Sequence, residues 1–134
     1  MNPARRTDWK TLEMPAETAH LEIDRVFTND DFARLCFGVV PGSMEDKWFV
    51  FYERPWLNLH RSWTGECIYR VRFERRGGGV AIVETVVSRA GDPRAVPDPA
   101  GDARRLLDLF ESIVRRNFRY GNVRLFPVLP VPPE

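Results

Sequence analysis

The middle of the chain alternates apolar and polar residues with a period of two, which is the pattern of β-strands. Residues 47–53 are almost all aromatic or β-branched and have apolar side chains on both faces, so this strand is expected to be covered on both sides. Further strands are predicted at residues 56–63, 66–75 and 80–88. Because the connections between them are short, the strands are expected to form an antiparallel meander.

Two other segments repeat apolar residues every three to four positions, which predicts amphipathic helices. The first is expected to start at residues 28–31, where an Asn or Thr cap precedes two acids, and to end at Gly38. The second is expected to start at Asp102 and to end at residues 120–122, and its apolar stripe comprises Ala103, Leu106, Leu107, Phe110, Ile113 and Val114. Both stripes are expected to pack on the sheet.

The two ends of the chain lack this patterning. Residues 1–20 are interpreted as an extended, loosely held lead-in, and residues 127–134 as a proline-rich tail. Short additional strands are predicted near residues 21–27 and 123–128. We therefore predict a single α+β domain over residues 21–126. It has an antiparallel meander sheet of four to five strands, with a short N-terminal helix and a longer amphipathic C-terminal helix packed on it.

The composition agrees with one domain, because a chain of 134 residues with 43% hydrophobic residues can bury a single core. No stretch approaches the ~18 uninterrupted apolar residues of a membrane helix. The first residues lack the apolar segment of a secretory signal. We therefore expect a cytoplasmic protein with no membrane partner.

The net charge is only +1, so nucleic acid is not expected as a partner. The charges are nevertheless segregated, since acids predominate in residues 13–46 and arginines in residues 47–89. Lys10 and Lys47 are the only lysines. This preference for arginine fits anion recognition through guanidinium groups, and it fits equally the composition of a GC-rich genome.

Cys36 and Cys67 lie far apart in the sequence, and His20 and His60 are the only histidines. These residues provide neither a disulfide framework nor a set of zinc ligands. We therefore expect two reduced thiols, no metal site and no cofactor.

The densest group of polar residues is at residues 60–67, His-Arg-Ser-Trp-Thr-Gly-Glu-Cys, in the second hairpin. A two-residue turn at Thr64-Gly65 would place Trp63 opposite Glu66 and His60 opposite Tyr69. This register puts the leucines of one strand on the same face as the arginines of the next. A one-residue bulge would remove that conflict by turning one strand over. Both registers fit the sequence.

His60 and Cys67 are the candidate catalytic residues, because the register without a bulge brings them within reach of each other as a thiol-imidazole pair. The sequence shows no third group that would orient the imidazole. The alternative interpretation is a structural histidine beside a buried thiol.

Arg61, Trp63, Arg70 and Arg72 are the candidate ligand-binding residues. Guanidinium groups bind phosphate or carboxylate with paired hydrogen bonds, and an indole can stack on a base or on a guanidinium. The alternative is a solvated sheet face on which glutamates of neighbouring strands neutralise the arginines.

Residues 44–54 and 56–69, with their aromatic strand and His-Arg-Ser-Trp-Thr-Gly hairpin, resemble a hairpin shared by small uncharacterised bacterial proteins. This resemblance implies no activity. Similar segments occur near ADP-ribose-processing domains, a setting that agrees with a site of arginine and tryptophan.

Three functions remain open from the sequence. The first is a binding or regulatory module whose arginine and tryptophan residues recognise an anionic, nucleotide-like small molecule or an acidic protein partner. The second is a small hydrolase or thiol-dependent enzyme that uses His60 and Cys67. The third is a structural module that forms a homodimer or larger homo-oligomer.

Overall fold

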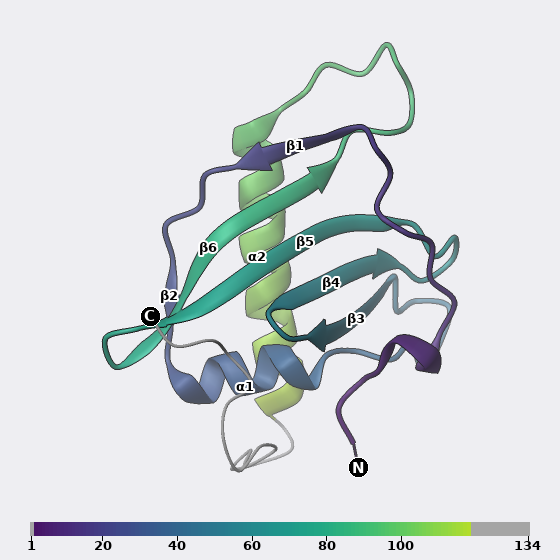
Figure 1. Cartoon of the computed structure of the whole chain (residues 1–134). Coiled ribbons are helices and arrows are strands. Elements are labelled where there is room, and N and C mark those ends of the chain that lie inside the picture. Colours follow the sequence, from purple (N-terminus) through teal and green to yellow (C-terminus); the bar gives the residue numbers. More distant parts are fainter. Residues whose placement is uncertain (1, 119–134) are drawn as a thin grey trace.

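The computed structural model describes residues 2–118 of the chain (Figure 1). In chain order the elements are a 3-10 helix η1 (Arg6–Asp8), β1 (Thr18–Leu21), β2 (Val26–Phe27), α1 (Asn29–Phe37), β3 (Trp48–Glu53), β4 (Trp56–Arg61), β5 (Cys67–Arg76), β6 (Gly79–Ser88) and α2 (Pro99–Phe118). The α+β class predicted from the sequence is confirmed.

The strands form one antiparallel sheet in the order β1-β6-β5-β4-β3, and β2 also pairs with β6. The predicted meander from β3 to β6 is confirmed. The sheet has six strands rather than four to five, because two short segments pair with β6. The interpretation of residues 1–20 as a loose lead-in is wrong at its end, since β1 begins at Thr18.

The local signals at the helix ends explain where both helices begin and where α1 stops. Thr28 caps α1 by accepting a hydrogen bond from the Asp31 amide (3.1 Å). Gly38 ends α1 at a φ of 74°, and a side chain there would overlap the Val50 carbonyl. The second helix starts at Pro99 rather than at Asp102, because Asp98 accepts from the Gly101 amide (3.1 Å).

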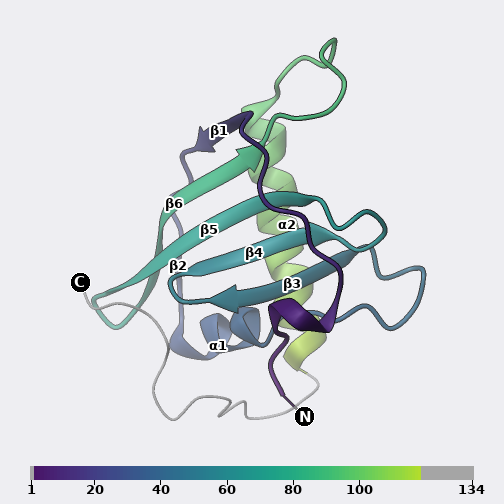
Figure 2. The same cartoon turned by 45° about the vertical axis from the view of Figure 1, so that its right-hand side comes forward.

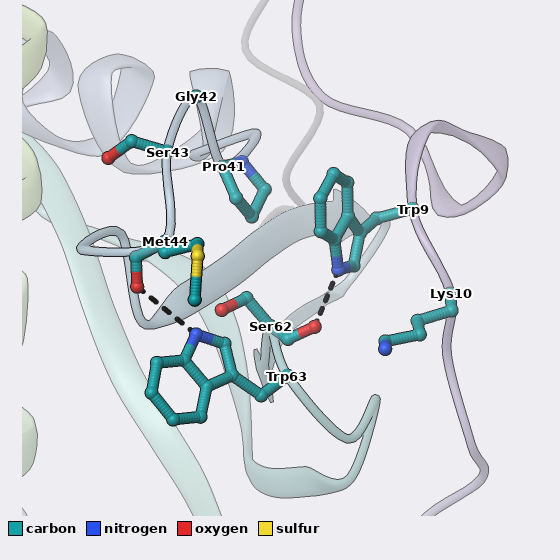
Figure 3. Close-up of a pocket in the computed structure, with 8 residues that line it drawn as sticks. All are labelled: Trp9, Lys10, Pro41, Gly42, Ser43, Met44, Ser62 and Trp63. Atoms are coloured by element: carbon teal, nitrogen blue, oxygen red, sulfur yellow. Dashed lines mark hydrogen bonds between the residues drawn. The ribbon is translucent and has the colours of Figure 1, made fainter.

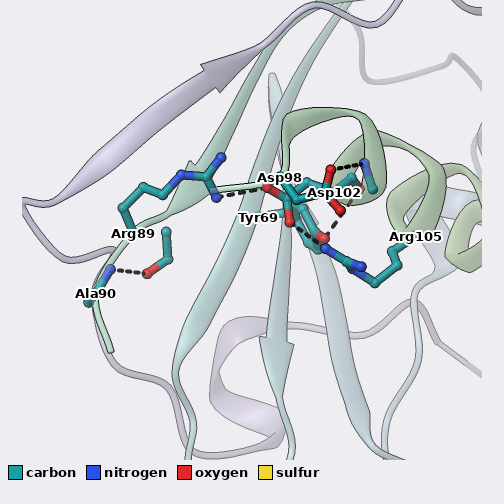
Figure 4. Close-up of polar contacts among 8 residues, drawn as sticks. Tyr69, Arg89, Ala90, Asp98, Asp102 and Arg105 are labelled. Carbon is teal, nitrogen blue, oxygen red and sulfur yellow. Dashed lines mark hydrogen bonds and ion pairs between the residues drawn. The ribbon is translucent and has the colours of Figure 1, made fainter. Parts of the chain in front are cut away.

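Asp102 has a different role from the cap that the sequence predicts (Figure 4). Its carboxylate accepts from Arg89 and from Arg105, each at 2.8 Å. The Tyr69 hydroxyl donates to the Asp102 backbone carbonyl (3.4 Å). Asp102 is 9% exposed, so its charge is paired rather than solvated, and it joins the first turn of α2 to the sheet.

We call the side of the sheet that packs on α2 the covered face (Figures 1 and 2). Leu106, Phe110 and Ile113 of α2 are each at most 2% exposed. The Phe110 ring meets that of Phe27 edge to face with centroids 5.7 Å apart. The strands contribute the buried residues Val50, Leu57, Leu59, Tyr69, Val71, Phe73, Val80, Ile82 and Val87.

We call the other side the open face; among the residues described, no α-helix packs on it (Figure 2). Its side chains include Phe49, Phe51, Trp56, Asn58, His60, Arg70, Arg72, Glu84 and Val86. The N-terminal segment crosses one end of this face. There Ala4 packs with the two phenylalanines, and Arg6 pairs with Glu53 (2.6 Å). The start of the lead-in is therefore held by specific contacts.

A one-residue bulge, one of the two registers that fit the sequence, is present between β4 and β5. Leu59 lies opposite Tyr69, whereas His60 lies opposite Cys67, so Ile68 is the extra residue. The bulge places the leucines of β4 on the covered face with the apolar residues of β5. The conflict seen in the sequence is thereby removed.

Residues 119–134 lie outside the described residues, and with them the predicted strand at 123–128 and the tail at 127–134. Within residues 2–118 neither helix combines the length and the apolar character needed to cross a membrane.

Candidate functional site

The turn between β4 and β5 differs from the two-residue turn predicted from the sequence. Strand β4 ends at Arg61 rather than at Trp63, and residues 62–65 make the turn. The Arg61 amide donates to the Glu66 carbonyl (2.9 Å), and the Gly65 amide donates to the Arg61 carbonyl (2.8 Å). Trp63 therefore leaves the sheet and projects from the turn.

His60 stabilises this turn from beneath. Its Nδ1 lies 2.9 Å from the Gly65 carbonyl, and because a carbonyl only accepts, Nδ1 carries the proton. The ring is 2% exposed and stacks on Phe51 with centroids 5.4 Å apart. Burial lowers the pKa of His60, against an opposing effect of the Gly65 hydrogen bond. His60 is thus a neutral, structural side chain.

Gly65 allows the N-terminal segment to pass close to the turn. Its φ is 80°, and a side chain added there would approach the Lys10 carbonyl to 3.2 Å. The Gly65 carbonyl also accepts from the Leu12 amide (2.8 Å). The turn therefore fixes where residues 9–12 run.

Ser62 connects the turn to two further segments. Its backbone amide donates to the Lys47 carbonyl (2.9 Å), and its hydroxyl donates to the Asp46 carbonyl (2.7 Å). Its own carbonyl accepts from the Trp9 indole N–H at 2.7 Å. Ser62 therefore joins the turn to the loop before β3 and to the N-terminal segment.

Asp46 closes the loop of residues 41–46. Its carboxylate accepts from the Gly42 amide (2.9 Å) and from Arg116 of α2 (3.1 Å). The Gly42 hydrogen bond and the Arg116 contact lower the pKa of Asp46, although partial desolvation opposes them. The loop is thus tied to itself and to α2.

These segments border a solvent-open cavity of about 580 Å³, which we call the tryptophan pocket (Figure 3). The N-terminal segment contributes Trp9 and Lys10, and the turn contributes Ser62 and Trp63. The loop before β3 contributes Pro41, Gly42, Ser43 and Met44. A volume in this range is typical of small-molecule sites.

Both indoles of the tryptophan pocket are held by hydrogen bonds at their N–H groups. Trp9 donates to Ser62, as described, and Trp63 donates to the Met44 carbonyl (3.1 Å) (Figure 3). The rings are nevertheless exposed to solvent, Trp9 by 38% and Trp63 by 62%. Because the N–H groups are occupied, these rings offer a ligand their apolar faces in fixed positions.

Met44 adds an exposed apolar side chain to the pocket. It is 79% exposed, and it lines the cavity together with the exposed Trp9 and Trp63. Scattered exposed apolar residues are ordinary, but a group of them around a cavity indicates a binding site. Lys10 is the charged residue that lines this cavity, so the pocket favours a negative group over a positive one.

His60 and Cys67, the candidate catalytic residues, are brought together but are buried, each 2% exposed. The Cys67 thiol contacts the Tyr69 carbonyl (3.6 Å), and burial raises its pKa to about 11 despite Arg70 and Arg6 nearby. Cys36 is also a free, buried thiol whose pKa burial raises. Both expected reduced thiols are thus present, in the protonated state that is typical of structural cysteines.

The structure separates the four candidate ligand-binding residues into three places. Arg61 stacks on Trp48 at the end of the covered face (5.1 Å). Arg70 and Arg72 lie together on the open face over a different tryptophan, Trp56, at 4.4 and 5.9 Å. Trp63 is in the tryptophan pocket. The bulge and the longer turn are the reason, because they change the faces that the sequence assigned.

Trp9, Lys10 and Met44 were missed by sequence reasoning. They lie in segments without periodicity, so nothing in their spacing indicated that they meet the turn. The unusual feature that could have pointed to them is a tryptophan in an otherwise unpatterned N-terminal segment.

Among residues 2–118, no group of three or more His, Cys, Asp or Glu side chains is arranged to hold a metal ion. Comparisons of the chain with protein-family models, curated proteins and solved structures return no match.

Proposed function

We propose that this protein is a binding module whose tryptophan pocket takes a small aromatic anion of the nucleotide type. The observation that carries this proposal is the pair of exposed indoles, Trp9 and Trp63, whose N–H groups are hydrogen-bonded while their faces border one cavity of about 580 Å³. Planar rings such as nucleobases stack on indole faces, and this stacking contributes roughly 1–3 kcal/mol per base.

The charge of the pocket supports an anion. Aromatic side chains alone would also suit a cationic ammonium group. Lys10 lines the same cavity, and no acidic side chain is among the residues that do so. A cation would therefore be repelled, whereas a phosphate or carboxylate attached to the ring would be attracted.

The rigidity of the site supports binding of a small ligand. The turn, the loop of residues 41–46 and the N-terminal segment are joined through Ser62 and Asp46. A site whose parts are already fixed loses little conformational entropy when a ligand binds. The hydrogen bonds of the His-Arg-Ser-Trp-Thr-Gly segment thus serve to hold the pocket in shape.

The experiment is a calorimetric titration with three probes: adenosine monophosphate, adenosine and inorganic phosphate. We expect the monophosphate to bind best, adenosine more weakly and phosphate not measurably. Trp63→Ala should weaken binding of the monophosphate about 5- to 100-fold, because it removes one stacking surface. Trp56→Ala, which removes a tryptophan outside the pocket, is the matched control and should leave the affinity unchanged.

The contribution of charge is tested with the two lysines. Lys10→Met should weaken binding of the monophosphate up to about fivefold and leave adenosine unaffected, because an exposed ion pair contributes up to ~1 kcal/mol. Lys47→Met is the control.

A pocket that binds neither adenosine nor its monophosphate would overturn the proposal. The same holds if the protein is a dimer that Trp63→Ala converts to a monomer in sedimentation, because the exposed indoles would then belong to a subunit interface. A loss of affinity in Trp56→Ala equal to that in Trp63→Ala would place the ligand elsewhere.

A further inference from the structure

The open face carries a second unusual feature, a guanidinium group without an acidic partner. Arg70 forms no ion pair with any residue of the described part of the chain. The other arginines on this face are paired, Arg72 with Glu84 (3.0 Å) and Arg6 with Glu53 (2.6 Å). The two nearby carboxylates are thus already occupied, and Arg70 is left as the unpaired cation.

Arg70 is nevertheless held in one position. Its guanidinium carbon lies 4.4 Å from the centroid of the Trp56 ring, and its Nε donates to Asn58 Oδ1 (3.1 Å). Asn58 is only 3% exposed, and its own amide donates to the Trp56 carbonyl (3.2 Å). Stacking and a partly buried hydrogen bond therefore orient the guanidinium, while its two terminal nitrogens make no hydrogen bond within residues 2–118.

An oriented guanidinium with free terminal nitrogens matches a carboxylate, which accepts two parallel hydrogen bonds. The electrostatic influence of Arg70 reaches across this face. Burial is the main effect on the pKa of Cys67 and raises it, and the charge of Arg70 opposes that increase. The pKa of Glu53 is lowered mainly by its hydrogen bond from Arg6, and the charge of Arg70 lowers it further. The position is thus electropositive before any partner binds.

We infer that the open face around Arg70 and Trp56 is a docking surface for an acidic segment of another protein, with one carboxylate bound by Arg70. A protein segment suits this surface because it can also pack against Trp56 and the half-buried Val86, which lies opposite Arg70 in the sheet. A nucleic acid suits it less, because the net charge of the chain is only +1 and a nucleic-acid partner requires many cations to neutralise its phosphates.

This surface is separate from the tryptophan pocket, since none of Trp56, Arg70 and Arg72 lines that cavity. The two proposals can therefore fail independently. Arg70→Gln should leave binding of adenosine monophosphate unchanged.

The experiment measures fluorescence anisotropy of a fluorescein-labelled octaglutamate peptide, with octaglutamine as the neutral control. We expect octaglutamate to bind and octaglutamine not to bind. Arg70→Gln should weaken the binding of octaglutamate roughly 10- to 100-fold, because hydrogen bonds between charged groups are lost. Arg94→Gln removes the same charge from a side chain that is 90% exposed, and should change the affinity less than twofold.

Arg70→Lys separates geometry from charge. Lysine keeps the charge but lacks the fork that binds a carboxylate with two parallel hydrogen bonds. Its affinity for octaglutamate should therefore lie between those of the native protein and Arg70→Gln. Thermal unfolding of each variant confirms that the fold is retained.

Equal losses in Arg70→Gln and Arg94→Gln would show attraction by overall charge and would overturn the inference. So would displacement of the peptide by millimolar phosphate at constant ionic strength, which indicates a site for small anions. If a single-stranded oligonucleotide binds more tightly than octaglutamate and depends equally on Arg70, the partner is a nucleic acid, and the inference of a protein partner is wrong.

Discussion

The two faces of the sheet are built on different physical principles. On the covered face, apolar side chains pack against α2. Phe73 of the sheet and Phe110 of α2, for example, are buried against each other. On the open face, arginines are placed over aromatic rings and opposite carboxylates. The larger buried cluster is on the covered face and the smaller one, of Ala4, Phe49 and Phe51, on the open face, so the covered face contributes more of the apolar burial that stabilises the fold.

The β4–β5 turn carries an exposed indole, and the open face carries a half-buried, oriented guanidinium without an acidic partner among the described residues. Trp63 is 62% exposed although a tryptophan gains more than most residues from burial. Arg70 lacks an acidic partner within the described residues although Arg72 beside it has one. Both proposals rest on these two features.

The largest expected effect tests the assignment of the core to the covered face. Phe73→Ala should lower the free energy of unfolding by about 3–5 kcal/mol, because it leaves a cavity beside Phe32 and Phe110. Val86→Ala on the open face should cost less than about 1 kcal/mol. Urea denaturation measures both, and similar losses would contradict the distinction between the faces.

A smaller effect is expected at the turn that shapes the tryptophan pocket. Gly65→Ala should destabilise the protein by about 1–2 kcal/mol, since its φ of 80° disfavours a side chain and the Lys10 carbonyl is close. It should also weaken binding of adenosine monophosphate, because Trp9 and Lys10 would shift.

The matched control for the turn is Gly77→Ala. Gly77 has a φ of 61°, but nothing lies within 4 Å of an added side chain. Gly77→Ala should therefore destabilise the fold without changing the affinity for adenosine monophosphate. Equal affinity in both variants would mean that the close approach of residue 10 to the turn does not shape the pocket.

The smallest effect is the pH dependence caused by His60. Burial lowers its native pKa below the value of about 6.5 expected in the unfolded chain. As the pH falls through 6.5, the unfolded state takes up a proton that the native state does not, so stability decreases until the native pKa is passed. The slope is at most ~1.4 kcal/mol per pH unit.

Denaturation between pH 5.5 and 7.5 measures this slope in a His20→Gln background, where His60 is the only histidine. The groups whose side chains surround His60 are Phe49, Phe51 and Cys67, with the charges of Arg6 and Arg70 nearby. Adding His60→Phe should remove the slope. Stability that increases on acidification in this range would show that His60 is charged in the native protein.

Much of the fold could be predicted because its signals are local. The alternation in residues 66–75, the cap at Thr28 and the helix end at Gly38 all act within a few residues. The start of α2 was predicted at Asp102, because an aspartate is a common cap, but Asp98 and Pro99 together form a better start. Competing local signals of similar strength cannot be ranked without the tertiary contacts.

The candidate site was predicted only in part. Of the polar group at residues 60–67, Ser62 and Trp63 do line the pocket. Trp63 and Arg70 are nevertheless on different surfaces, because the bulge and the longer turn change the faces that the sequence pattern assigned. Trp9 and Lys10 reach the site through contacts between distant parts of the chain, such as the hydrogen bond from Trp9 to Ser62. Such contacts leave no periodicity in the sequence.

The most direct test of the account uses three of the four tryptophans as reporters of the two surfaces. In a 1H–15N spectrum, the indole signals of Trp9 and Trp63 should shift when adenosine monophosphate is added, whereas that of Trp56 should not. Octaglutamate should shift the Trp56 signal and leave the other two in place. Shifts of Trp56 with adenosine monophosphate, or of Trp9 and Trp63 with octaglutamate, would contradict the separation of a ligand pocket from a partner surface.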